Sequence, residues 1–288
     1  MIPCSPFKLT QLFIVVGALT GCSPTEEINA LKQRTLDNLV FVKGGTFMMG
    51  DIGYEDESGQ FRNFGPDADA FPAHQVTLTS YSILRYEITY AEYDLFAEVT
   101  GREKPLQRYR DEVYTGPNYP VDGVTWDESR AYCQWIGEQL GYPMDLSTEA
   151  QWEYAARSRG KAVAYATDNG EFEPGRNIRD ATKVKHEMPV GSWPPNPMGL
   201  YDMTGNVDEW TVDAWHIYQE HSLVDPIYDE GMPKYSNSKV TRGSGIIGGR
   251  GQITLYVRAV REPDNTGAGI GIRCVANHPE PITEVRAK

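Results

Sequence analysis

The sequence predicts an α+β protein that is rich in loops, with few helices and short strands. Three observations support this prediction. The 288 residues include 28 glycines, 19 prolines and 17 tyrosines, which favours irregular backbone over a helical bundle. Helical periodicity with capping signals occurs in a few segments before Arg157, and we find none after it. The rest of the chain combines glycine, proline and aromatic residues with short apolar runs. We therefore expect a disulfide and bound cations to hold it in place.

Strands and one helix are predicted for the first part of the domain. Residues 40–51 (VFVKGGTFMMGD) alternate between apolar and small residues, which is typical of a strand. Residues 71–101 predict a strand, a turn, a second strand and a helix that begins near Thr89 and ends at Gly101.

Two more helices carry their own start signals. Thr125 and Glu128 have the spacing of a capping box, and Gly141 ends the apolar helical pattern that follows. Thr148 and Gln151 repeat the arrangement before Trp152. After this second helix we expect only loops and short strands.

The net charge of −13 excludes some partners. Nucleic acid and anionic lipid surfaces repel an acidic protein, so neither is expected as a partner. Divalent cations and basic proteins remain compatible with this charge, as does simple solubility.

The N-terminus has the features of an export signal. Lys8 precedes a short apolar run, and residues 1–21 end in Leu-Thr-Gly before Cys22, which resembles a bacterial lipobox. The resemblance implies that Cys22 is lipidated, that residues 22–38 form a polar tether, and that the protein is anchored in the outer membrane facing the periplasm. A cleaved signal without lipid is the alternative.

The remaining cysteines are few. Once Cys4 leaves with the signal and Cys22 carries lipid, only Cys133 and Cys274 are left. In an oxidising compartment two such residues favour one disulfide, with two separate buried thiols as the alternative.

A glycine pattern near the C-terminus imitates a nucleotide-binding loop. Gly243, Gly245 and Gly248 spell G-x-G-x-x-G, but a dinucleotide site requires a helix after the last glycine. Instead, residues 253–259 alternate with period two and predict a strand. This excludes the phosphate-binding interpretation.

Several segments together resemble formylglycine-generating enzymes, the sulfatase-modifying factors. These segments are FVKGGTFMMGD, YPVDGVTWDESRAYCQWIGEQLG, LSTEAQWEYAAR, PVGSWPPNPMGLYDMTGNVDEW, VTRGSGIIG and VRAVREPDNTGAGIGIRCV. The resemblance spans residues 39–276 and leaves 277–288 as a tail. It implies the loop-rich, C-type-lectin-related fold of that family, with short antiparallel strands.

The same resemblance places the family's catalytic positions on unsuitable residues. The two thiols that bind copper in the family fall on Gly248 and Ile253, and a nearby hydroxyl falls on Gly245. Neither Gly248 nor Ile253 offers the soft thiolate ligand that copper(I) requires, so copper binding and oxidase activity are not expected.

A polar groove is a further implication. A tryptophan of the family is replaced by Asp208, which together with Arg250 and Tyr256 suggests a polar ligand; a solvated surface is the alternative.

Structural sites of the family have candidates in this chain. The resemblance implies calcium, with Asp202 and Glu209 as side-chain ligands and Gly205 and Val207 as carbonyl ligands; a turn without metal is the alternative. A second site would involve Asn177, Ile178 and Asp180. The family also has a disulfide at the positions of Cys133 and Cys274, and its closing motif implies that Arg258, Arg261 and Arg273 hold core carboxylates.

Three functions follow as hypotheses. The first is a binding or accessory lipoprotein of the envelope that recognises a protein or small ligand, by analogy as part of a secretion or motility machine. The second is a formylglycine-generating oxidase with relocated ligands, or a related oxidative tailoring enzyme. The third is a lectin-like receptor.

Overall fold

The computed structural model describes residues 23–65, 68–105, 116–245 and 253–286. These residues contain the helices α1 to α4 and short strands of two to seven residues, in antiparallel and mixed sheets. The α-helices are Pro24–Asn38 (α1), Tyr90–Thr100 (α2), Trp126–Leu140 (α3) and Glu149–Ala156 (α4); the short 3-10 helices are Ala68–Ala70 (η1) and Pro233–Tyr235 (η3). The strands are Leu39–Val42 (β1), Gly45–Met49 (β2), Tyr54–Glu55 (β3), Phe61–Arg62 (β4), His74–Leu78 (β5), Tyr81–Leu84 (β6), Met144–Leu146 (β7), Asp208–Ala214 (β8), Leu223–Val224 (β9), Lys239–Arg242 (β10), Ala259–Arg261 (β11), Ile270–Gly271 (β12) and Cys274–Ala276 (β13).

The predicted helices form where the capping signals place them. In α2, α3 and α4 the side chain of the threonine before the first turn accepts a hydrogen bond from the backbone N–H of the third helical residue. The side chain of that third residue in turn accepts one from the backbone N–H of the threonine. Gly101 and Gly141 end α2 and α3 in the left-handed conformation, as expected for glycine at this position. The loop-rich α+β prediction is therefore confirmed.

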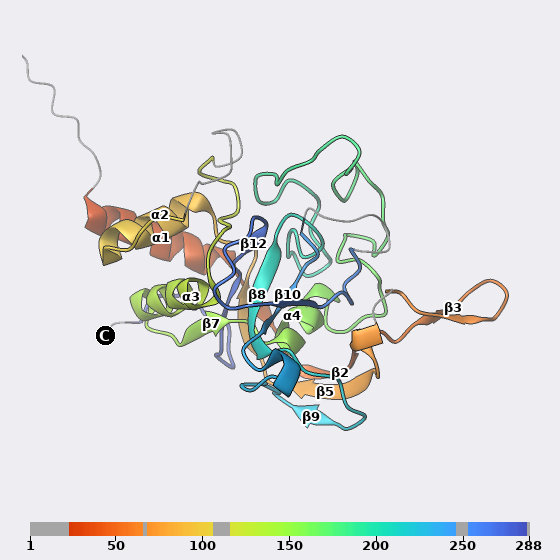
Figure 1. Ribbon diagram of the computed structural model, residues 1–288. Coiled ribbons are helices and arrows are strands. Elements are labelled where there is room, and N and C mark those ends of the chain that lie inside the picture. The colour runs from red at the N-terminus through yellow and green to blue at the C-terminus, as the bar shows by residue number, and fades with distance from the viewer. Residues whose placement is uncertain (1–22, 66–67, 106–115, 246–252, 287–288) are drawn as a thin grey trace, which may run out of the picture.

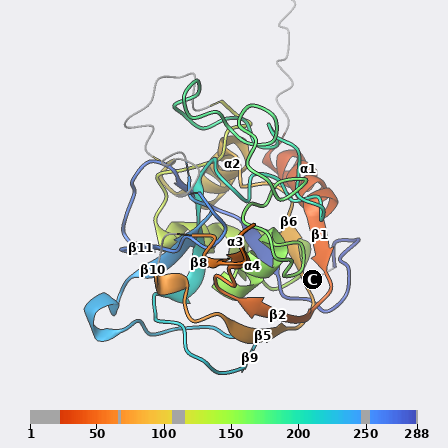
Figure 2. The ribbon, with the colours of Figure 1, turned by 90° about the vertical axis from the view of Figure 1, so that its right-hand side faces the viewer.

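Two sheets of four strands form the centre of the molecule. One has the order β1-β6-β13-β7, and the other has the order β11-β10-β8-β12. A third sheet, β2-β5-β9, lies below α4 in Figures 1 and 2. Most neighbouring strands are antiparallel, but β12 pairs with β8 and β9 with β5 in parallel. The long loops between α4 and β8, green to teal in Figure 1, cover the upper side of the molecule.

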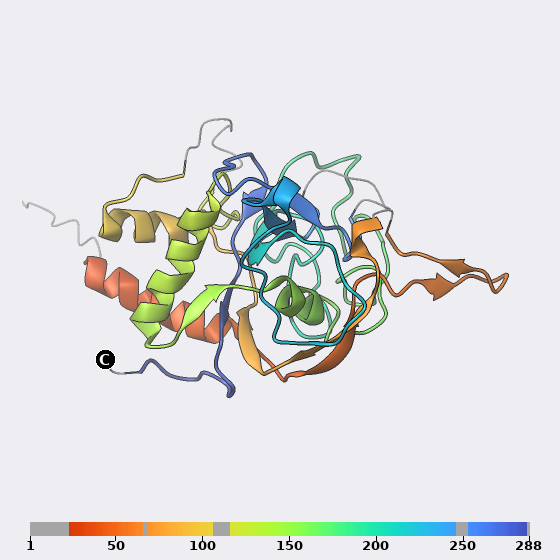
Figure 3. The same cartoon turned by 60° about the horizontal axis from the view of Figure 1, so that its bottom comes forward.

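The two ends of the molecule differ. Helices α1, α2 and α3 lie together at one end, whereas the hairpin β3–β4 projects from the opposite end (Figures 1 and 3). The first hydrophobic core lies among these helices and includes the buried residues Leu31, Phe96 and Ile136. The second lies under α4 and includes Trp152.

The segment expected as a polar tether is instead an ordered helix. Ser23 and Glu26 form a capping box, Pro24 occupies the first turn, and α1 packs against α2 and α3. Leu31 is fully buried and Leu36 nearly so, which makes residues 24–38 part of the domain. The C-terminal residues also pack, since Ile282 is buried in the same core. The capping box and the proline are present in the sequence, but α1 has only a short apolar face, so the helical period was too weak to predict it.

The strand expected over residues 253–259 is wrong for most of its length. Only β11, Ala259–Arg261, is extended in the sheet, and residues 253–256 form bends and turns. Residues 253 to 256 are all buried, so the alternation in the sequence does not separate a core face from a solvent face. The N–H of Leu255 donates to the carbonyl of Ala164 and that of Val257 to Thr254, bonds that belong to a turn and a loop contact.

Within the described residues, no helix combines the length and apolar character that crossing a bilayer requires.

Candidate functional site

A buried network of charges joins α4 to the second sheet. Glu149 and Glu153 lie on α4, and Arg242 on β10 donates to both, at 2.7 Å and 3.0 Å. Arg258 donates twice to Glu149, at 2.6 Å and 2.9 Å. Burial alone would raise the pKa of Glu149, but Arg258 and Arg242 lower it to about 2. The network therefore fixes the loop before β11 against α4, which agrees with the expected structural role of Arg258.

Glu209 is held by a second buried arginine. Arg273 donates to Oε1 of Glu209 at 2.7 Å and 2.9 Å and to Oε2 at 3.0 Å, and the indole N–H of Trp152 donates to Oε2 at 2.7 Å. This agrees with the structural role expected of Arg273. The Glu209 carboxylate, which was expected to bind calcium, is therefore hydrogen-bonded to the Arg273 guanidinium and the Trp152 indole instead.

Asp208, the first residue of β8, lines a groove. The cavity has a volume of about 330 Å³ and includes Asp208, Ser244, Gly245, Val257, Ala259, Arg261, Asn265, Gly267, Ala268, Gly269 and Ile270 in its walls. Arg261 donates to Asp208 at 3.1 Å, and Thr241 donates at 3.4 Å. Burial raises the pKa of Asp208, while the Arg261 charge opposes the shift. We call this cavity the Asp208 groove.

The other residues proposed for this groove are located elsewhere. Tyr256 is buried, donates its hydroxyl proton to the carbonyl of Val163 at 3.0 Å and stacks on Phe64. It is therefore a packing residue and does not line the Asp208 groove. Arg250 lies outside the described residues. Arg261 takes the cationic place in the groove that the sequence suggested for Arg250.

The loop 202–207 brings two buried carboxylates together. Asp202 and Asn206 adopt positive φ of 59° and 61°, and Asp202 accepts a bond from the Gly191 N–H at 2.6 Å. Glu87, which follows β6, accepts from the Asn206 amide at 2.6 Å and from the Val207 N–H at 3.2 Å. Burial, and then the charge of Asp202, raise the pKa of Glu87 well above its usual range. Burial raises the pKa of Asp202 to about 6.

This carboxylate pair suits a hard cation. No salt bridge among the described residues reaches Glu87 or Asp202. Burial disfavours the ionised forms of both carboxylates, and the nearby charge of Arg273 favours them. A divalent ion, with the carbonyls of Gly205 and Val207 as further oxygen donors, would favour the ionised forms further. Among the described residues, no group of three or more His, Cys, Asp or Glu side chains could hold a metal ion. A calcium ion at Glu87 and Asp202 would therefore need the backbone carbonyls as additional ligands. Of the two carboxylates expected as ligands, Glu209 is bound by Arg273 and Trp152, and Asp202 has Glu87 as its neighbour instead.

The second expected cation site is not assembled in the same way. Asn177 is buried, and its side-chain amide donates to Asp168, Asn169 and Glu173. Asp180 instead accepts from Thr182 and pairs with Lys183. Ile178 is buried in a small cluster with Tyr165 and Ile253. The described contacts therefore do not bring Asp180 to Asn177.

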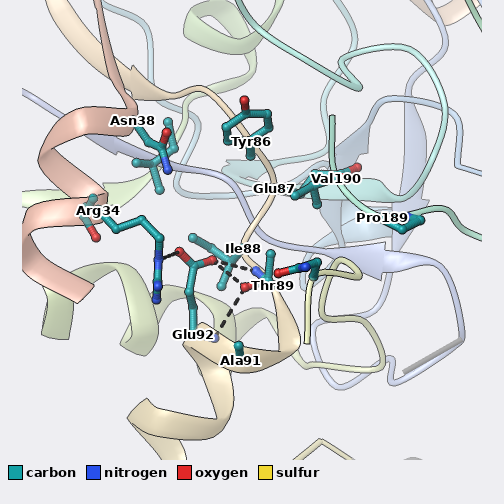
Figure 4. A pocket seen from close by; sticks show the side chains of 13 residues that line it. Arg34, Asn38, Tyr86, Glu87, Ile88, Thr89, Ala91, Glu92, Pro189 and Val190 are labelled. Carbon is teal, nitrogen blue, oxygen red and sulfur yellow. Dashed lines mark hydrogen bonds and ion pairs between the residues drawn. The ribbon is translucent and has the colours of Figure 1, made fainter. Parts of the chain in front are cut away.

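A second pocket, of about 360 Å³, lies between α1 and the start of α2. Figure 4 shows the Arg34–Glu92 ion pair on one side of it and Glu87 with Val190 on the other. The N–H and hydroxyl of Thr89 both donate to Glu92 at 2.8 Å, so this carboxylate caps α2 as well as binding α1. The pair adds a polar contact between α1 and α2 to the packing of Leu31 and Leu36.

The profile of the sulfatase-modifying factor enzyme 1-like domain matches residues 24–278. The chain belongs to this family. The formylglycine-generating enzyme of Mus musculus is 26% identical, over 84% of this chain and 76% of that protein. The inactive C-alpha-formylglycine-generating enzyme 2 of Bos taurus is 26% identical, over 86% of this chain and 91% of its own length. The solved structure of PvdO from Pseudomonas aeruginosa is similar with a TM-score of 0.65 and 26% identity, covering 83% of this chain and 93% of PvdO.

The positions at which the resemblance places the family's thiols, Gly248 and Ile253, carry no sulfur in this chain. Ile253 is buried against Tyr165 and Ile178, and Gly248 lies outside the described residues. Cys133 of α3 and Cys274 of β13 form the expected disulfide, with Cα atoms 5.4 Å apart, which confirms that prediction. Since Cys4 and Cys22 are the only other cysteines, residues 23–288 contain no pair of thiols for copper, and the residues present do not fit it.

Two residues of this family member were missed from the sequence. Glu87 is the one acidic residue in the stretch YSILRYEI, and this was the only signal for a buried site. For Arg261 the sequence predicted only a structural role, with which its ion pair to Asp208 agrees. Its position in the groove was missed because the groove is completed by the loop 265–269, which has no periodic pattern.

Proposed function

We propose that this family member is a binding or accessory protein of the cell envelope and not an oxidase. The observation that carries the proposal is the Cys133–Cys274 disulfide. It consumes both cysteines that follow Cys22, so no thiol pair remains to bind copper(I) and activate oxygen. The enzyme fold would then serve recognition, with the Asp208 groove as the site for a small ligand or a segment of an envelope protein.

The proposal includes anchoring through lipid on Cys22 and calcium as a structural cofactor. Glu87 and Asp202, with the carbonyls of Gly205 and Val207, would hold the calcium ion and so pin the loop 202–207 beside β8. By analogy, the partner would belong to a secretion or motility machine. Nucleic acid is not proposed, since the net charge of −13 opposes it.

Similarity to formylglycine-generating enzymes over most of the chain favours one alternative, an oxidase with other copper ligands. A turnover assay separates the two. The purified protein is incubated with copper(I), oxygen and a peptide that carries a sulfatase cysteine motif, and the product is examined by mass spectrometry. We expect no formylglycine. A product that disappears with a copper chelator would overturn the binding-protein proposal.

Anchoring has its own experiment. Cys22→Ser should release the protein from the membrane fraction, whereas Cys4→Ser, in the segment to be cleaved, should leave it there. Equal fractionation of the two variants would reject lipidation of Cys22.

A further inference from the structure

The Asp208 groove contains a partly buried ion pair in a cavity the size of a small metabolite. Its volume of about 330 Å³ lies near the lower end for ligand pockets, which start at about 300 Å³. Its walls combine the charged pair with small apolar side chains, Val257, Ala259, Ala268 and Ile270. This composition suits a compact ligand with a charged head and an aliphatic body.

The groove offers hydrogen-bond donors that the protein does not use. Arg261 donates one N–H to Asp208 and one, at 3.4 Å, to the carbonyl of Val260, although a guanidinium has five N–H groups. The Asn265 oxygen accepts from the Gly267 N–H at 2.7 Å, while no acceptor within the described residues takes its amide N–H groups. A guanidinium and an amide together suit a carboxylate.

The groove also offers an acceptor for a cation. Asp208 receives hydrogen bonds from Arg261, Thr241 and the Gly245 N–H. An ionised carboxylate has about four acceptor positions, so one position is left for a further donor. A ligand ammonium beside Arg261 would use it.

Charge balance decides between ligand classes. The Asp208–Arg261 pair is neutral as a whole, and both side chains are at least partly buried. A ligand with a single charge would attract one member of the pair, repel the other and leave a net charge in the groove. A ligand with both charges on neighbouring atoms keeps the groove neutral and engages both side chains.

We infer that the Asp208 groove binds a free α-amino acid with an aliphatic side chain. The α-carboxylate binds Arg261 and Asn265, the α-ammonium binds Asp208, and the side chain packs against Val257, Ala268 and Ile270. The inference rests on the proposed function, because it names the ligand class of the same groove.

Calorimetric titration of the calcium-loaded, full-length mature protein with L-leucine, L-leucinamide and N-acetyl-L-leucine tests the inference. L-leucinamide lacks the carboxylate, and N-acetyl-L-leucine lacks the ammonium. We expect L-leucine to bind and each analogue to bind at least about tenfold more weakly, since each loses a charge-assisted contact. Equal affinity for all three compounds, or no binding of L-leucine, would overturn the inference without any variant.

Two variants assign the contacts. In Arg261→Gln the preference for L-leucine over L-leucinamide should vanish, while the preference over N-acetyl-L-leucine remains. In Asp208→Asn the pattern should reverse. Arg62→Gln, which removes an arginine of the hairpin β3–β4, is the control and should keep both preferences. If both groove variants lowered all affinities equally, a structural role would explain the ion pair and the assignment would be wrong.

The outcome is separable from the proposed function. Failure of L-leucine to bind, with no formylglycine in the copper assay, rejects the amino-acid ligand and leaves the binding-protein role in place. Formylglycine formation rejects that role whatever L-leucine does.

Discussion

Arg258 holds Glu149 through two parallel hydrogen bonds, from Nε to Oε1 at 2.6 Å and from Nη2 to Oε2 at 2.9 Å. Both side chains are buried, and Arg242 binds the same carboxylate from β10. A loop region with little regular structure is thus joined to α4 by charge rather than by a sheet. The predictions below begin with this pair.

Removing the carboxylate should unfold the domain more easily. Glu149→Gln leaves Arg258 and Arg242 buried with less compensation, and we expect a loss of about 3–5 kcal/mol in the free energy of unfolding, measured in urea. Lys104→Gln, which breaks the exposed pair with Asp94, is the control and should change the urea midpoint little. Similar losses in both variants would contradict the role of the network.

Reducing the disulfide should also destabilise the protein. Cys133 and Cys274 are 141 residues apart, and closing so long a loop stabilises by about 5 kcal/mol in the chain-entropy model. We expect dithiothreitol to lower the melting temperature of the wild type and to have no effect on a Cys133→Ala/Cys274→Ala variant. An unchanged wild-type melting temperature after complete reduction would refute the prediction.

Asp213 should make stability fall as the pH rises. It is buried and accepts from the N–H groups of Glu149 and Tyr228 at 2.7 Å and 2.8 Å, and burial raises its pKa to about 7. Between the unfolded pKa of about 3.9 and this value, the folded state binds the proton more tightly. Asp213 therefore stabilises fully below pH 4, and its contribution is lost as the pH rises towards 7.

Asp213→Asn should remove this contribution. The slope of unfolding free energy against pH between 4 and 7 should become less negative by up to about 1.4 kcal/mol per pH unit. Glu57→Gln, on the exposed hairpin, should keep the wild-type slope. Parallel curves for wild type and Asp213→Asn would show that Asp213 is not protonated in this range.

Calcium should stabilise the folded protein through Glu87 and Asp202. At about 100 times the dissociation constant, a bound ion adds about 2.7 kcal/mol, visible as a higher melting temperature than in chelator. Glu87→Gln and Asp202→Ala should each abolish this gain, whereas Asp94→Asn on the surface of α2 should retain it. Identical melting of the wild type with calcium and with chelator would remove calcium from the proposal.

Leu31 should contribute to the stability of the whole domain. Its side chain is fully buried in the first core, so Leu31→Ala should cost about 2–5 kcal/mol by creating a cavity. Gln33→Ala, on the exposed face of α1, should cost far less. Equal unfolding curves for Leu31→Ala and wild type would mean that α1 is not part of the cooperative unit.

Local signals predicted most of the helices, because capping depends on residues three apart. Thr89, Thr125 and Thr148 each begin a helix as expected. The sequence did not predict the turn at 253–256, because the residues that decide it, such as Ala164, are far away in the chain. The candidate site was predicted in part for the same reason. Asp202 stands in a recognisable motif, whereas its neighbour Glu87 comes from a strand end more than 100 residues earlier, and only folding brings the two together.

The capping box at Ser23 bears on how such a lipoprotein would sit on a bilayer. Cys22 is the residue immediately before this cap, and α1 is packed firmly on the domain. If Cys22 carries acyl chains, as proposed, the lipid is joined directly to the cap of α1, and no long linker separates the domain from the membrane. Its distance from the lipid headgroups and its tilt would be set by the axis of α1, so a partner would have to approach the domain at the membrane surface.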